Sequence, residues 1–191
     1  MKYVDPPFML GETLKGTDDD GNEINSHWEG QIFELPDVDV SASSIRGSKS
    51  RQGGRQIKAV ICRNSKGSAL TAAKKVLKFD IGTSNSRIAL GRITAQSGGT
   101  AEWAGIGDQY LTSTVADKEL FWVILEGPCK VTTNSGSSAV AVGDILVSAA
   151  SGEAAEIGAS ADAIDGVNAI ARALQTSDGS DEILVSACVR H

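Results

Sequence analysis

The sequence predicts a mainly β protein, a small β-barrel or β-sandwich domain with an extended N-terminal arm. Short runs rich in β-branched and aromatic residues recur along the last two thirds of the chain, and turn residues separate them. Aromatic residues make up only 5% of the chain, whereas Gly, Ala, Ser and Thr are abundant. A chain of 191 residues is long enough for one good core plus an appendage.

Residues 1–55 are expected to form the arm, because polar and proline-containing stretches interrupt each apolar run. Asp5-Pro6-Pro7, an acidic turn at residues 17–22 and a polar tract at residues 41–55 lie between short apolar segments. Within the arm, only residues 31–35 are predicted to form a strand, which Pro36 ends.

Residues 56–191 are expected to form the β domain. The pattern predicts strands at residues 57–63, 75–81, 87–93, 120–125, 129–133, 139–142, 145–148 and 182–189. Gly127-Pro128 is expected to end one strand before the next begins at Cys129. Residues 161–174 fit either a helix or a strand, because their apolar spacing is nearly helical while Gly166 weakens a helix. Gly105-Ile106-Gly107 lacks the third glycine of a dinucleotide-binding motif and is expected in a loop.

Charge and cysteine content narrow the range of partners. The net charge of −6 disfavours direct nucleic-acid binding. Cys62, Cys129 and Cys188 lie in apolar, strand-like runs without a CxxC pair, so we expect buried thiols and no metal. The first ten residues do not resemble a signal peptide, and no apolar run has the length of a membrane span. These features predict assembly in the cytoplasm without a membrane partner.

Residues for acid–base catalysis are scarce, and we expect no catalytic, cofactor or metal site and no enzymatic activity. His27 lies in the arm and His191 is the final residue, so neither is placed to form a triad. The acidic turn at residues 17–22 has the wrong spacing for a calcium loop, since His27 stands where a bidentate Glu belongs.

One motif favours a different function. The segment from Asp80 to Ser84, Asp-Ile-Gly-Thr-Ser, resembles the first phosphate loop of the sugar kinase, actin and Hsp70 superfamily. That superfamily requires two large lobes and a second Asp-x-Gly loop, for which this chain is too short. An ordinary hairpin turn is therefore the preferred interpretation, and a nucleotide-binding enzyme is the alternative.

The run at residues 103–131, followed by Val-Gly-Asp-Ile-Leu-Val at 142–147, carries a family resemblance that extends over about residues 77–189. It resembles the decoration, cement or head-stabilising proteins that tailed bacteriophages add to their capsids. The resemblance implies a virion structural protein on the outer capsid surface, bound to the major capsid protein and self-associated, most often as a homotrimer. Another virion part, such as a head fibre base or a tail or baseplate subunit, has the same composition and is the alternative.

Two groups of residues are candidates for interfaces. Phe121 and Trp122 point to opposite faces of their predicted strand, so one requires cover from a loop, the arm or another subunit. Core packing and interface burial both remain open for this pair, and Trp103 joins it as a large apolar residue. The second group is the basic tract, which is either a solvated loop or a contact with the capsid or a neighbouring subunit. Its cations are Arg46, Lys49, Arg51 and Arg55.

Overall fold

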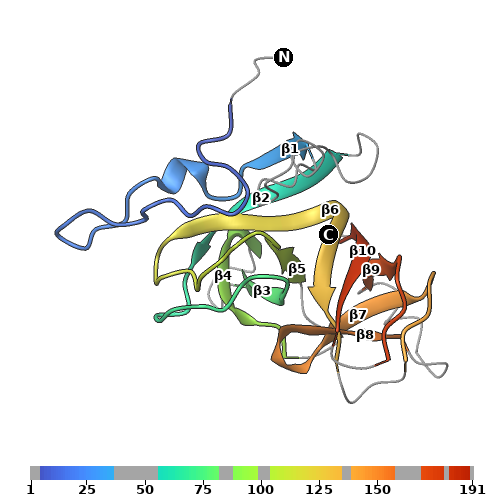
Figure 1. Ribbon diagram of the computed structural model, residues 1–191. Helices are drawn as coiled ribbons and strands as arrows, with labels where there is room; N and C mark the ends of the chain where they lie inside the picture. Colours follow the sequence, from blue (N-terminus) through green and yellow to red (C-terminus); the bar gives the residue numbers. More distant parts are fainter. Residues whose placement is uncertain are drawn as a thin grey trace.

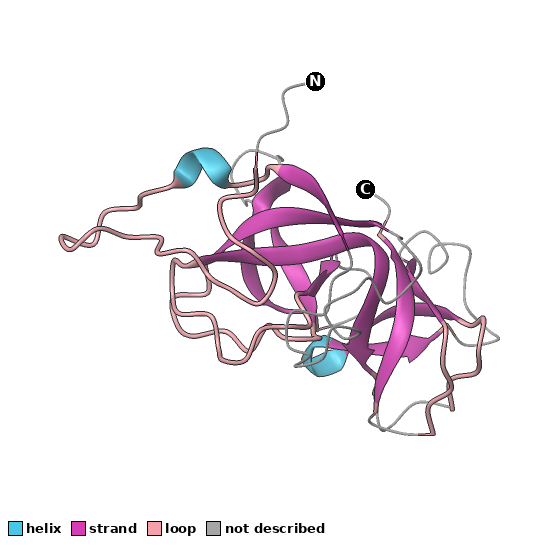
Figure 2. Cartoon of the chain, turned by 45° about the horizontal axis from the view of Figure 1, so that its top comes forward, coloured by secondary structure: helices cyan, strands magenta, loops and turns pink. Residues whose placement is uncertain are grey.

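Strand β6, at Leu120–Thr132, is shared between the two halves of the fold (Figure 1). The structure is a computed structural model that describes residues 5–36, 56–81, 88–98, 104–134, 139–157, 169–178 and 181–189. Strands account for 52% of it, which confirms the mainly β prediction. The helical segments of the described residues are two single 3-10 turns, Ser26–Trp28 and Ala150–Gly152 (Figure 2).

The first half is a closed five-stranded barrel. Its strands follow the order β2, β4, β3, β5 and β6, and β6 pairs back onto β2 to close the ring. The short β2–β4 pairing is parallel, and the other barrel pairings are antiparallel. Strand β1 adds to the outside of the ring by pairing with the first part of β2. These strands are β1 at Ile32–Pro36, β2 at Gln56–Asn64, β3 at Val76–Ile81, β4 at Ile88–Gln96 and β5 at Ala104–Gly107.

The second half is an antiparallel sheet that grows from the far end of β6. Residues 126–132 of β6 pair with β10, and the sheet continues through β9 and β7 to β8. A single bridge between Thr133 and Ala154 brings the chain after β6 back to β8. The strands are β7 at Ile145–Ala149, β8 at Glu153–Glu156, β9 at Ala169–Ala173 and β10 at Glu182–Cys188.

Both faces of β6 are buried, which explains its uninterrupted apolar run. One set of alternating side chains, Phe121, Val123 and Leu125, packs inside the barrel with residues that include Val60 and Phe79. The other set packs in a second core shared by the N-terminal segment and the second sheet. This second set is Leu120, Trp122 and Ile124.

The prediction that Gly127-Pro128 separates two strands is wrong, because β6 bends there and continues. Gly127 has a φ of 103°, and a Cβ at this position would lie 2.6 Å from the carbonyl oxygen of Gln56. Glycine therefore allows β6 to cross closely over β2 while it bends. Pro128 falls where β6 has left β2 and lies opposite Ser186 of β10.

Other element predictions had mixed outcomes. Residues 104–107 form β5 and not a loop, because Gly105 packs directly against β6 and a Cβ there would lie 2.5 Å from Cγ1 of Val123. The strand alternative is correct for β9, while the preceding residues 158–168 lie outside the described part of the chain. The strand predicted at 139–142 is reduced to one bridge between Val140 and Ser177. Strand β8 was not predicted.

We predict that Gly127→Ala lowers the free energy of unfolding by about 2–5 kcal/mol, since it adds both backbone strain and a clash with β2. Chemical denaturation of the purified protein measures this. Gly143 has a φ of 98° but open space around its Cα, so Gly143→Ala isolates the strain alone and should cost about 1–2 kcal/mol. Equal losses in the two variants would show that close packing at the bend is unimportant.

Candidate functional site

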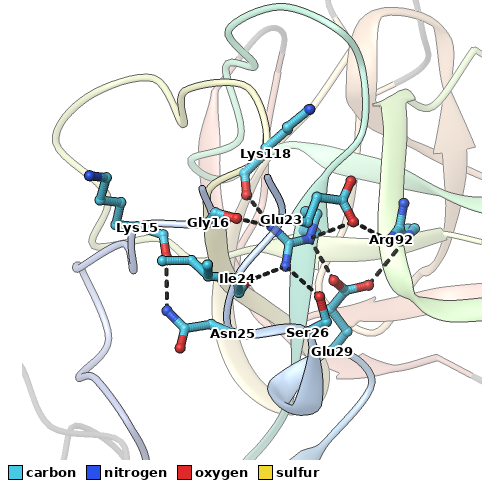
Figure 3. A network of polar contacts seen from close by, with 10 residues as sticks. Lys15, Gly16, Glu23, Ile24, Asn25, Ser26, Glu29, Arg92 and Lys118 are labelled. Carbon is cyan, nitrogen blue, oxygen red and sulfur yellow. Dashed lines mark hydrogen bonds and ion pairs between the residues drawn. The ribbon is translucent and has the colours of Figure 1, made fainter. Parts of the chain in front are cut away.

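Arg63, near the end of β2, has a side chain that is 0% exposed and makes five hydrogen bonds. Its guanidinium donates hydrogen bonds to the N-terminal segment and to the loop before β6 (Figure 3). The acceptors are Glu29 Oε1 at 2.5 Å, the carbonyl oxygens of Gly16, Ile24 and Lys118 at 2.6, 2.7 and 2.9 Å, and Ser26 Oγ at 3.3 Å. Buried charge is tolerated here because the guanidinium is paired and hydrogen-bonded.

A second arginine extends this cluster. Arg92 of β4 donates from Nε to Glu29 Oε2 at 3.0 Å and from Nη2 to Glu23 Oε2 at 2.7 Å. The carboxylate of Glu29 therefore lies between two guanidinium groups. Burial alone would raise the pKa of Glu23, but its hydrogen bond to Arg92 and the charges of Arg92 and Arg63 lower it overall. The cluster thus fastens an acidic segment to a cationic site on the barrel.

Aromatic packing provides a second attachment of the N-terminal segment. The rings of Phe8 and Trp122 lie 5.0 Å apart, and Phe33 meets Trp122 edge-on at 5.5 Å. Trp122 Nε1 donates to the carbonyl oxygen of Phe8 at 3.3 Å. Leu14 and Leu120 exchange two backbone hydrogen bonds of 2.9 and 3.0 Å. The N-terminal segment therefore covers the outer face of β6.

Asp108, directly after β5, makes the third attachment. Its Oδ2 accepts from the backbone N–H of Gly11 at 2.5 Å, and its Oδ1 accepts from that of Tyr110 at 2.9 Å. Burial raises the pKa of Asp108 to about 6 even though both hydrogen bonds act to lower it. The carboxylate therefore titrates close to the mildly acidic range while it holds the N-terminal segment.

Two of the aromatic interface candidates lie in the core within a single chain, and their role between subunits stays a prediction. Phe121 and Trp122 are each 0% exposed, with Phe121 inside the barrel and Trp122 beneath the N-terminal segment. Within a single chain both are core residues, and the N-terminal segment is what covers Trp122. Their alternation onto opposite faces was predicted correctly, and the arm was one of the three covers considered.

The remaining interface candidates lie outside the described residues, and their roles stay predictions. They are Trp103 and the basic tract with Arg46, Lys49, Arg51 and Arg55.

Asp80 of β3 lies opposite Ala89 of β4, as a hairpin requires. Residues 82–84 of the phosphate-loop motif are outside the described residues. In the acidic turn, Asp18 Oδ1 accepts from the N–H groups of Asp20 and Asn22. The described residues hold no group of three His, Cys, Asp or Glu side chains placed to bind a metal.

Cys62 and Cys129 are buried as expected, but Cys188 is exposed. Strand β10 alternates between buried and exposed positions, and Cys188 falls on its outer face. Among the described residues, no helix has the length and hydropathy needed to cross a membrane.

The sequence reasoning did not identify Arg63, Glu29 or Asp108 as important residues. A signal for Arg63 exists in the sequence, because a cation directly after the apolar run Ala59–Cys62 of a barrel strand requires a buried partner. The partners themselves lie 34 and more residues away and depend on the fold.

No family model and no curated protein matches the chain. Among solved structures, it is similar to the crystal structure of the head fiber gp8.5 N base of bacteriophage phi29, with 17% sequence identity and a TM-score of 0.41. The similarity covers 71% of this chain and 99% of the phi29 chain.

Replacing Arg63 tests the buried cluster. Arg63→Met removes the donors for three carbonyl oxygens and leaves Glu29 with one arginine, so we expect a loss of about 3–5 kcal/mol in unfolding free energy. The control is Lys15→Met, which breaks an ion pair with Asp19 whose side chains are 64% and 98% exposed and should change stability by less than about 1 kcal/mol. Similar small effects in both variants would contradict the structural role of Arg63.

Asp108 should give the protein a specific pH dependence. Its pKa is raised from 3.8 to about 6, so the folded state binds the proton more tightly than the unfolded state does. Protonation of Asp108 therefore stabilises the folded state. This stabilisation is fully present below about pH 4 and is lost as the pH rises through about 6, which lowers the free energy of unfolding by about 3 kcal/mol. The pKa values of Asp18 and Glu23 are lowered in the folded state, so the stabilisation that these two carboxylates provide is lost as the pH falls, opposite to the effect of Asp108.

The difference in unfolding free energy between the wild type and Asp108→Asn, measured at each pH, isolates the effect of Asp108. Asp108→Asn lacks the titrating group and loses one acceptor, which adds an offset that does not vary with pH. Urea denaturation of both proteins between pH 4 and 7 should show the wild-type stability falling relative to the variant. A constant difference over this range would refute the assignment.

Proposed function

We propose that the protein is a virion structural protein that binds the outside of an icosahedral capsid and stabilises the lattice of the major capsid protein. The family resemblance of residues 103–131 and 142–147 supports this proposal. Much of the resembling sequence is β6, the strand that both halves of the fold share. The resemblance therefore concerns the residues on which the architecture depends.

The observation that carries the proposal is the structural use of two buried charged groups, Arg63 and Asp108, and the partly buried Glu29. Arg63, Glu29 and Asp108 all fix the N-terminal segment onto the barrel, where each makes structural hydrogen bonds. A shell-stabilising protein needs a domain that keeps its shape under load, and such attachments oppose deformation of the surface. The proposal accordingly assigns no catalytic role to these residues.

Self-association, as a homotrimer, is part of the proposal. A trimer that engages three capsid sites binds more tightly than one subunit does, because its second and third contacts are intramolecular. Because Phe121 and Trp122 are core residues within one chain, the proposal assigns the contacts between trimer subunits mainly to surface groups. The basic tract contains four of the 18 Lys and Arg residues and no carboxylate. The rest of the chain therefore has 14 Lys and Arg residues and 24 Asp and Glu residues, and is acidic overall. Charge therefore favours docking of this tract on an acidic protein surface.

The number of copies in purified particles tests the proposal. We predict hundreds of copies per particle by quantitative mass spectrometry against the major capsid protein, and loss of particle stability to heat or chelation when the protein is absent. A few copies per particle would instead indicate a head fibre base or a tail or baseplate subunit. Absence from particles, together with a melting-temperature increase in Mg-ATP that Asp80→Ala abolishes, would favour the nucleotide-binding enzyme.

A further inference from the structure

Residues 5–36 are the part of the predicted arm that the structure describes, and from here on the arm means these residues. The arm attaches to the rest of the chain through at least four sets of contacts. These are the arginine cluster, the packing of Phe8 and Phe33 on Trp122, the hydrogen bond from Gly11 to Asp108, and the pairing of β1 with β2. Each set joins residues of the arm directly to residues of the barrel. The same contacts are therefore geometrically available to an arm from a different copy of the chain.

The arm has internal structure of its own. Thr17 bridges to Glu23, and Asp18 and Asn22 exchange backbone and side-chain hydrogen bonds at the turn. Asn25 Nδ2 donates to the carbonyl oxygen of Lys15 at 3.0 Å. Figure 1 shows this hairpin projecting from the barrel, with η1 beside its base. These contacts remain within the arm wherever it binds, so it can move as one unit.

Charge makes the barrel a specific receptor for the arm. The arm carries eight carboxylates and one lysine, and its Glu23 and Glu29 meet the cationic pair Arg63 and Arg92. Arg63 is completely buried by the arm and the loop before β6. An empty receptor would leave this cation and Trp122 uncovered, which strongly favours occupation by some arm.

The connection between arm and barrel is longer than attachment to the same chain requires. Pro36 and Gln56 lie directly opposite each other at the end of the β1–β2 pairing. Two residues suffice to join strand ends in this position. Residues 37–55 form the connection instead, and a chain of this length reaches about 60 Å when extended. The expected diameter of a domain of this size is about 40 Å, so the reach includes a neighbouring copy.

We propose that the arm is exchanged between copies of the protein, binding the Arg63–Trp122 site of a neighbour when copies are held close together. The partner is a second copy of this chain, and the interface consists of the contacts already described. Exchange competes with attachment to the same chain, whose effective concentration is in the millimolar range for short flexible links and falls with length. Exchange is therefore favoured when copies are closely spaced or highly concentrated, whether or not a capsid is present.

A disulfide between the arm and the barrel distinguishes the two arrangements. Glu34 and Lys58 lie opposite each other on β1 and β2, at a Cα separation that a disulfide spans. We would refold Glu34→Cys/Lys58→Cys, in a Cys188→Ser background, at about 10 µM and about 1 mM and then oxidise it. We predict covalent multimers on non-reducing denaturing gels, at least tenfold more abundant at the higher concentration. Complete oxidation with monomers alone at both concentrations would overturn the proposal.

Two controls make this result specific. Thr132→Cys/Glu182→Cys links β6 to β10, which belong to the same body, and should give monomers at every concentration. Replacing residues 37–55 by Asn-Gly in the first variant favours a tight hairpin within one chain and should reduce multimers at least tenfold. Undiminished multimers in this shortened variant would also overturn the proposal. Because no particle is involved, failure here is distinguishable from failure of the proposed virion role.

Discussion

Burial of both faces of β6 is the constraint on which the rest of the structure depends. A strand inside a barrel ordinarily needs only one apolar face, yet residues 120–125 are apolar without interruption. The inner face completes the barrel core, and the outer face requires a separate cover. The arm and the second sheet supply that cover from opposite ends of the chain, so β6 links all parts of the fold.

The arm combines two kinds of attachment that complement each other. Phe8 on Trp122 contributes apolar burial without strong directional preference, whereas Arg63 requires acceptors at fixed positions. A paired buried charge adds little net stability compared with apolar packing, but loss of its partners is costly. Arg63 therefore fixes where the arm lies more than how tightly it binds. This combination permits an arm to change its partner copy while it keeps one geometry.

Local pattern predicted much of the fold because strands and turns have short-range signals. The runs at β2, β3, β7 and β10 were found to within one or two residues, and the mainly β class followed from them. Gly127 and Gly105 were misread because close approach between strands leaves the same sequence signal as a turn or loop. The attachment site was missed for a different reason. Arg63 meets Glu29 only after β2 and the arm are placed, and sequence spacing contains no record of that contact.

Native-state hydrogen exchange of β6 tests most directly whether one shared strand unites the fold. The amides of Val123 and Val131 lie on either side of the bend at Gly127, in the barrel part and the second-sheet part respectively. If β6 joins both parts into one cooperative unit, these amides exchange only through global unfolding and show the same free energy of opening. Markedly lower protection of Val131 than of Val123 would show that the second sheet opens independently, and it would contradict this account.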